Sequence, residues 1–139
     1  MPIPMELQHA TEIFDRFLAD VCDASGLATR NQAYTTAQAV LVVFRRRLIP
    51  RDAIRFAGLL PAVLAAIFID EWDIDEPVRP FVSRADLTQE VKALRRHHNF
   101  SPDTAIHDVA VALRRHVETV AFEQLLATLP KEAADFWRV

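Results

Sequence analysis

The sequence has very little glycine and cysteine. Only two of its 139 residues are glycine, Gly26 and Gly58. Tight hairpins and phosphate-binding loops both depend on glycine, so we expect neither a hairpin-rich β fold nor a glycine-loop nucleotide site. The single cysteine, Cys22, cannot form an internal disulfide. Its helical neighbours Leu18 and Val21 indicate a small buried apolar side chain rather than a reactive thiol.

Long apolar runs and a strong charge of either sign are also absent. The longest apolar stretch, residues 56–69, contains a proline and is too short to span a bilayer. The first residues lack the cationic start and the apolar stretch of a signal peptide. The net charge of −3 gives no general attraction to nucleic acid or to an anionic membrane. We therefore expect a cytoplasmic protein with no membrane partner and no strong nucleic-acid signal.

What the sequence does contain is helical periodicity over most of its length. Val40, Leu41 and Phe44, for example, share one face of a helix. Prolines and Gly26 fall between such stretches, where helices begin or end. We predict an all-α fold, a single compact bundle of about seven helices. The expected helical ranges are 4–24, 31–48, 51–59, 61–69, 84–98, 102–118, 120–128 and 130–137.

One segment, residues 70–83, has no helical pattern. Its sequence, "DEWDIDEPVRPFVS", contains five acidic residues and two prolines, which is typical of a connector. We expect Gly26 to cap the end of the first helix. We expect Ser101 to cap the helix over 102–118, with Pro102 at its first position.

The two halves of the sequence resemble each other when Pro61 is placed on Pro130, an offset of 69 residues. Neither copy is large enough to bury its own apolar face, so each is expected to cover the other within one domain, 1–139. The predicted repeats span about 5–69 and 84–137, and each has a long helix followed by two short helices. The identical pairs are Val40/Val109, Val42/Val111, Arg45/Arg114, Arg46/Arg115, Leu60/Leu129, Pro61/Pro130 and Ala65/Ala134.

The aligned apolar positions also predict the core, in which alanine at Phe44 or Leu113 would cost about 2–5 kcal/mol. Trp72 lies among acids in the connector, where an indole could cover the seam between the copies or mark a small pocket. The residues expected in the core are Phe44, Leu48, Pro61, Phe68, Leu113, Pro130 and Trp137.

Three stretches of this sequence carry a resemblance to a known family. They are "AYTTAQAVLVVFRRRL", "FAGLLPAVLAAIFIDEWD" and the second-copy pattern "VAVALRRHV…LLATLPKEAADFW". With both Leu-Pro repeats, the chain resembles the bacterial domain-of-unknown-function family numbered 2267, from about Ile13 to Trp137. The resemblance implies an all-α bacterial domain and implies no reaction.

Two arginine clusters allow a plain reading and a functional one. At about 100° per residue, the core stripe leaves Arg46 pointing away from the core, with Arg45 and Arg47 beside it. Cations in the last turn of a helix complement its dipole and form a solvated face, which is the plain reading. The functional reading is that the arginines form a surface that binds an anionic partner. Residues 114–116 repeat the arrangement.

Other candidate sites have simpler explanations. His97 and His98 are adjacent, so they point about 100° apart and do not converge on one metal ion. The acids of 70–76 lack the glycine turn and the closing glutamate of a calcium-binding loop. No activated nucleophile or paired carboxylates can be proposed, so we expect no catalytic residue, no metal and no cofactor.

Two classes of function remain open for a protein without a catalytic site. One is a protein-interaction, scaffold or oligomerisation module, which we favour. The alternative is a small-molecule or anion-binding module that uses a pocket between the two repeats. An apolar pocket with a few polar groups would favour a ligand, and an exposed apolar patch would favour a protein partner.

A candidate interaction surface follows from the outward face of the two central helices. Val42 and Val111 lie about 140° from the core stripe, and each precedes an outward arginine, Arg46 or Arg115, by four residues. The helices over 51–59 and 120–128 could fold back over the valines and make them part of the core. Otherwise the four residues would form a patch for a partner protein or a second copy of the chain.

Overall fold

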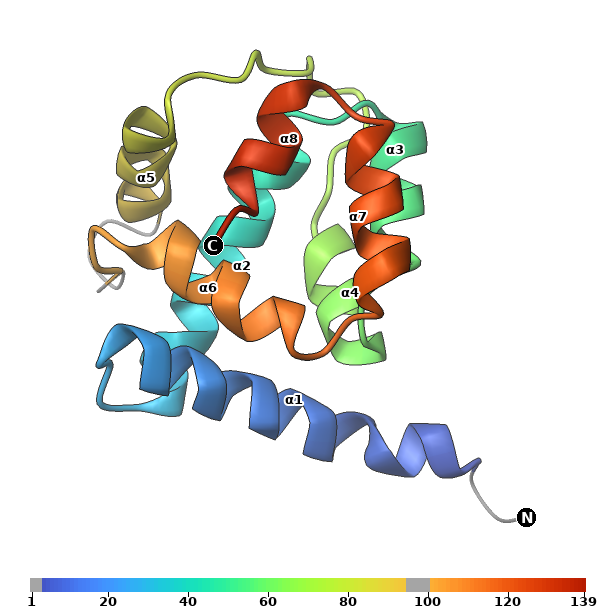
Figure 1. Ribbon diagram of the computed structural model, residues 1–139, viewed down its shortest axis with the longest axis vertical. Helices are drawn as coiled ribbons and strands as arrows, with labels where there is room; N and C mark the ends of the chain where they lie inside the picture. The colour runs from blue at the N-terminus through green and yellow to red at the C-terminus, as the bar shows by residue number, and fades with distance from the viewer. Residues whose placement is uncertain (1–3, 95–100) are drawn as a thin grey trace.

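The computed structural model describes residues 4–94 and 101–139, which form eight α-helices and no strand (Figure 1). This confirms the all-α prediction: the eight helices correspond to the eight expected ranges, against the overall expectation of about seven. The helices are α1 (Met5–Ser25), α2 (Arg30–Arg45), α3 (Pro50–Ala57), α4 (Ala62–Ile69), α5 (Arg84–Ala93), α6 (Ala105–Arg114), α7 (Thr119–Ala127) and α8 (Lys131–Phe136).

Helix α2 ends at Arg45, three residues before the predicted end at 48. Proline disfavours helical geometry in the residue before it, and Ile49, which precedes Pro50, is accordingly extended. The chain between α2 and α3 therefore closes with tight turns, in which Leu48 N donates to Arg45 O at 3.0 Å. Because α2 stops early, the arginine run continues into this turn.

Helix α6 begins three residues later than predicted, and the proposed cap is used elsewhere. Ala105 N donates to Pro102 O at 3.0 Å, which makes 102–104 a turn in front of the helix. The Ser101 hydroxyl is buried and donates to Thr36 Oγ1 on α2 at 3.1 Å, so it joins two helices and does not cap α6. The predicted helix over 84–98 ends at Ala93, and its last residues lie outside the described part of the chain.

The start of α2 is fixed by a capping box. Thr29 Oγ1 accepts from Gln32 N at 3.1 Å, and Gln32 Oε1 accepts from Thr29 N at 3.3 Å. Just before it, Gly26 ends α1 in the left-handed conformation, with φ 75°, as its predicted capping role requires. These two ends set the direction in which α2 enters the core.

We expect Thr29→Ala to lower the free energy of unfolding by about 1 kcal/mol, because the Gln32 amide at the start of α2 would lose its acceptor. For a domain of this size the melting temperature should fall by roughly 3–5 °C. Thr11→Ala on the exposed face of α1 is the matched control and should leave it nearly unchanged. Equal melting temperatures for both variants would contradict the capping role.

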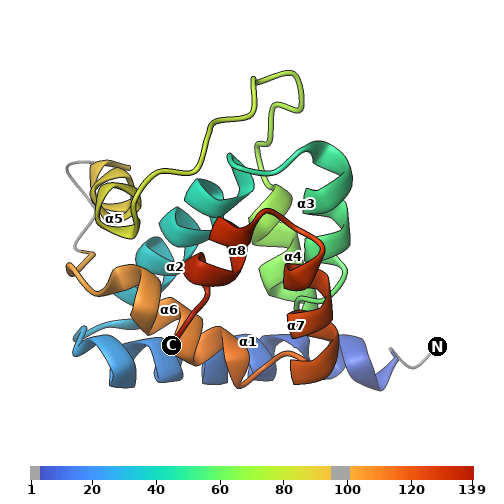
Figure 2. The same cartoon turned by 45° about the horizontal axis from the view of Figure 1, so that its top comes forward.

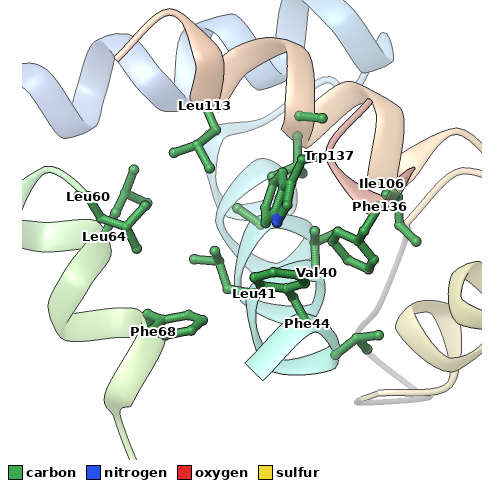
Figure 3. Close-up of a cluster of buried hydrophobic side chains, with 14 of the residues drawn as sticks. Val40, Leu41, Phe44, Leu60, Leu64, Phe68, Ile106, Leu113, Phe136 and Trp137 are labelled. Atoms are coloured by element: carbon green, nitrogen blue, oxygen red, sulfur yellow. The ribbon is translucent and has the colours of Figure 1, made fainter. Parts of the chain in front are cut away.

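Aromatic rings fill the centre of the bundle (Figure 3). The Phe44 ring lies 4.8 Å from the Phe56 ring, 5.0 Å from Phe136 and 5.3 Å from Trp137, measured between centroids. Of the residues expected in the core, five have side chains that are nearly or fully inaccessible to solvent. These are Phe44, Leu48, Phe68, Leu113 and Trp137.

The two prolines of the predicted core are placed differently. Pro61 is half-buried and Pro130 is exposed. Each is the residue before a short helix, α4 or α8, and has φ close to −52°. The prolines of the repeated Leu-Pro pattern therefore fix the backbone where these helices start, whereas the leucines before them, Leu60 and Leu129, are buried.

The helices surround α2 and α6. Helix α1 packs along α6 and also contacts α2 and α4, while α5 packs on α2. Figure 2 shows α1 beneath α6, and the segment between α4 and α5 extending away from the helices at the other side. Among the described residues, no helix combines the length and the apolar character that crossing a membrane requires.

Candidate functional site

Two arginines predicted to lie on a solvated face are buried. Arg45 and Arg47 are 6% and 7% exposed, and Arg46 is half-buried. The sequence pattern shows which way a side chain leaves its own helix, but not what lies over it. Here the connector and α5 cover the end of α2, so the plain reading of these arginines is wrong for this cluster.

Arg47 joins α2 to α5 and to the connector. Its guanidinium donates to both oxygens of Glu90 on α5, with Nη2 to Oε1 at 3.2 Å. Its Nη1 also donates to Val43 O at 3.1 Å, and its Nε to Pro80 O at 3.3 Å. A buried guanidinium is stable only when such acceptors surround it, so these bonds fix the position of α5 on α2.

Glu90 is the anion that three arginines share. Besides Arg47, Arg79 Nη1 donates to its Oε1 at 3.1 Å, and Arg46 Nη1 lies 3.9 Å from its Oε2. Burial by itself would raise the pKa of Glu90, but the hydrogen bond and charge of Arg47, together with Arg46 and Arg79, lower the pKa below its usual value. Arg79 also bonds Glu76, at 3.1 Å. These interactions thus hold the connector against the end of α2 and against α5.

Arg45 differs from its neighbours because it has no carboxylate partner among the described residues. Its Nη1 donates to Phe68 O at 2.9 Å and Asp70 O at 3.4 Å, and its guanidinium carbon lies 5.7 Å from the centroid of the Trp72 ring. Its Nε is buried without a hydrogen bond. Burial, followed by the charge of Arg46, lowers the pKa of Arg45. Trp72 therefore covers a buried cation, a role the sequence did not suggest.

A cavity of about 170 Å³, which we call the Arg45 cavity, opens between α2, the residues after α4 and Leu94 after α5. Val42 lies in its wall and is half-buried. One of the two sequence-based readings placed the helix over 51–59 on top of this valine. In the structure, α3 packs mainly on α4. The residues that line the cavity are Thr35, Gln38, Ala39, Val42, Arg45, Asp70, Glu71 and Leu94.

A shallow hollow lies on the other side of Arg45, where the connector passes the end of α2. Its apolar members form what we call the connector surface. Ile74 and Val78 are exposed, at 62% and 45%. Four acids nearby, at 70, 71, 73 and 75, are exposed and form no ion pair with described residues. The connector surface comprises Pro50, Trp72, Ile74, Pro77 and Val78.

The second arginine cluster has other partners. Arg114 Nε donates to Trp137 O at 2.8 Å. The exposed Arg115 lies 3.0 Å from Asp20 on α1, and His116 Nε2 lies 2.7 Å from the same carboxylate. The half-buried Val111 is on this side of the fold.

The candidate interaction surface is therefore divided between two places. Val42 and Arg46 lie against the connector and α5, whereas Arg115 lies against α1. The structure brings Val42 close to Arg45, which the sequence did not single out. His97 and His98 lie outside the described residues, and within 4–94 and 101–139 no three His, Cys, Asp or Glu side chains gather as a metal site would need.

The profile of a family described as "Uncharacterized conserved protein (DUF2267)" matches residues 14–136, nearly the whole chain. The protein belongs to this family. The DUF2267 match confirms the resemblance carried by the repeated Leu-Pro stretches, and it runs from the middle of α1 to the end of α8. A comparison with functionally curated proteins gave no match. DUF2267 membership thus assigns the chain to a family without assigning a reaction to it.

Proposed function

We propose that this protein is a non-catalytic, cytoplasmic binding module that recognises a protein partner through the connector surface. The observation that carries the proposal is the build of residues 70–83. Segments of this length without secondary structure are uncommon in compact domains and usually functional. This one is held at its base by Arg79, Glu76 and Glu90, while Ile74 and Val78 face solvent. Exposed apolar side chains on a fixed support are what a partner can bury.

The charges around the connector surface indicate the chemistry of the partner. Asp70, Glu71, Asp73 and Asp75 are exposed and unpaired among the described residues, whereas the arginines of this region are engaged by Glu90 and Glu76 or buried. A partner with an apolar anchor flanked by lysine or arginine would gain complementary charge as well as burial. We therefore favour a basic, apolar protein segment.

One described histidine lies close enough to a carboxylate to invite a comparison with acid–base sites. The closest histidine–carboxylate pair is His116 and Asp20, and Arg115 binds the same carboxylate. No described serine, threonine or cysteine bonds to His116, so the pair has no nucleophile to activate. The pair joins α1 to the end of α6, which is a structural use.

We expect Ile74→Ser to weaken binding of a basic peptide probe in which lysine and leucine alternate. Losing part of one buried isoleucine contact should cost about 1 kcal/mol, or roughly fivefold in affinity. Fluorescence anisotropy with the labelled peptide measures this. Ile54→Ser is the matched control, because Ile54 on α3 is exposed to nearly the same extent, 64% against 62%.

Two results would contradict the proposal. One is equal weakening by Ile74→Ser and Ile54→Ser, which would mean that the peptide binds without regard to the connector surface. The other is equal affinity for a probe of the same charge in which serine replaces leucine. Both variants change exposed side chains, so both should fold with unchanged melting temperature.

We also propose that the domain consists of two copies of one unit, and three kinds of observation support this. Helices α2 and α6 end 69 residues apart, at Arg45 and Arg114, and α3 and α7 begin 69 apart, as do α4 and α8. Arg45 donates to Phe68 O, and Arg114 donates to Trp137 O, again at equivalent positions.

The third observation concerns the first helix of each copy. The paired cations after α2, Arg46 and Arg47, bind Glu90 on α5, the first helix of the second copy. The corresponding pair after α6, Arg115 and His116, binds Asp20 on α1, the first helix of the first copy. Each proposed copy thus binds the first helix of the other, which favours one core shared by both copies.

The Arg45 cavity supports a second candidate function, that of a small-molecule-binding module. It lies between elements of the two proposed copies, α2 and the end of α5, and combines an apolar wall with a buried cation. Ligand sites combine apolar walls with a few placed polar groups, and this cavity has both kinds of lining, with polar residues in the majority.

A further inference from the structure

We propose that the Arg45 cavity binds a small zwitterion, a molecule with a carboxylate, an ammonium group and a short apolar side chain, such as an aliphatic amino acid. This inference rests on the second candidate function and names its ligand class. Three parts of the cavity wall each match one part of such a molecule.

The carboxylate is matched by Arg45. This guanidinium is 6% exposed, and none of its described hydrogen bonds is to an anion. The carboxylates of Glu76 and Asp70 favour its charge without forming an ion pair with it, so a bound carboxylate would supply an anionic partner in direct contact. Gln38, whose half-buried amide also lines the cavity, adds a neutral donor.

The ammonium group is matched by two acids of the cavity wall. Asp70 and Glu71 are exposed carboxylates with no ion pair among the described residues. Glu71 has φ 53°, a left-handed conformation that is unfavourable for a residue with a side chain. Such strain persists where the surrounding structure enforces it, often at binding sites. A simple anion would be repelled by these acids, so the wall favours a molecule that carries both charges.

The apolar side chain is matched by Ala39, Val42 and Leu94, which line the same cavity. Its volume is about 170 Å³, and a cavity of roughly 150 Å³ is enough for a benzene-sized molecule. This suits a ligand of about the size of leucine.

The test compares three probes on the whole protein by nuclear magnetic resonance titration. L-leucine has all three groups, isocaproate lacks the ammonium group and isoamylamine lacks the carboxylate. We expect leucine to bind at least tenfold more tightly than either, with amide shifts at Gln38, Val42 and Glu71. Binding of isocaproate alone would contradict the proposal that the ligand is a zwitterion, but it would agree with the second candidate function, a small-molecule-binding module. No binding of any probe at millimolar concentration would overturn both.

Three variants locate the site. Arg45→Gln should abolish leucine binding, and Val42→Phe, which fills the cavity from a half-buried position, should do so without removing a charge. Glu71→Asn introduces a residue that tolerates the left-handed conformation. It should weaken the binding of leucine about threefold and leave the binding of isocaproate unchanged. Leucine binding that survives Val42→Phe would overturn the assignment to this cavity, even if Arg45→Gln does not fold. The peptide assay on Ile74 is separate, so failure of one proposal is distinguishable from failure of the other.

Discussion

Phe44→Ala is expected to lower the free energy of unfolding by about 3–5 kcal/mol, which is a large part of the total stability of a small domain. The Phe44 side chain is fully buried and its ring meets those of Phe56, Phe136 and Trp137. These rings come from three helices, α2, α3 and the end of α8, so a cavity at Phe44 cannot close by moving one of them. Chemical denaturation monitored by circular dichroism gives the value.

The matched control for Phe44→Ala is Val120→Ala on α7, where the side chain is 61% exposed. It should change the free energy of unfolding by less than about 0.5 kcal/mol. A cost for Phe44→Ala below about 1 kcal/mol would mean that the ring cluster is not the centre of the fold.

Glu90→Gln is expected to cost about 2–3 kcal/mol, because it removes the charge on which three arginines converge. Arg47 is the most affected, since it is buried and cannot lose its own charge. Glu12→Gln, on an exposed part of α1 and without an ion pair among described residues, is the control and should be nearly neutral.

The same pairing predicts how stability depends on pH. Because the folded protein lowers the pKa of Glu90, the unfolded chain takes up this proton at a higher pH than the folded protein does. The stabilisation is therefore fully present above the ordinary glutamate pKa of 4.5 and is lost as the pH falls below it. Denaturation at several pH values should show that the free energy of unfolding decreases less steeply with falling pH for Glu90→Gln than for the native protein. Parallel curves would contradict this role of Glu90.

The helices could be predicted because their cause is local. The spacing of Val40, Leu41 and Phe44 determines which face of α2 is apolar, and all three are buried. The capping role of Gly26 also has a local cause, because α1 ends with a residue of positive φ and glycine adopts that conformation readily. The boundaries near Pro50 and Pro102 were less predictable, because a tight turn competes there with one more turn of helix.

The candidate site could not be predicted in the same way, because it is made by segments far apart in sequence. Glu90 is one acid among many on a helix surface, and nothing local marks it as the partner of Arg47, 43 residues away. Arg45 looked solvated because the pattern of one helix cannot show that Trp72 returns over it. Only Val42 carried a signal, an apolar residue outside the core stripe, and it lines the cavity.

The place of Trp137 in the ring cluster has a consequence for the synthesis of the protein. A ribosome adds about 5–20 residues per second, so roughly 5–20 s separate the appearance of Phe44 from that of Trp137. Helix α1 likewise waits for α6, its main partner, which comes about eighty residues after it. The newly made first half therefore exposes the face of helix α2 that carries Phe44 to the cell for many seconds. The yield of folded protein will depend on how well that helix is shielded before residue 137 emerges.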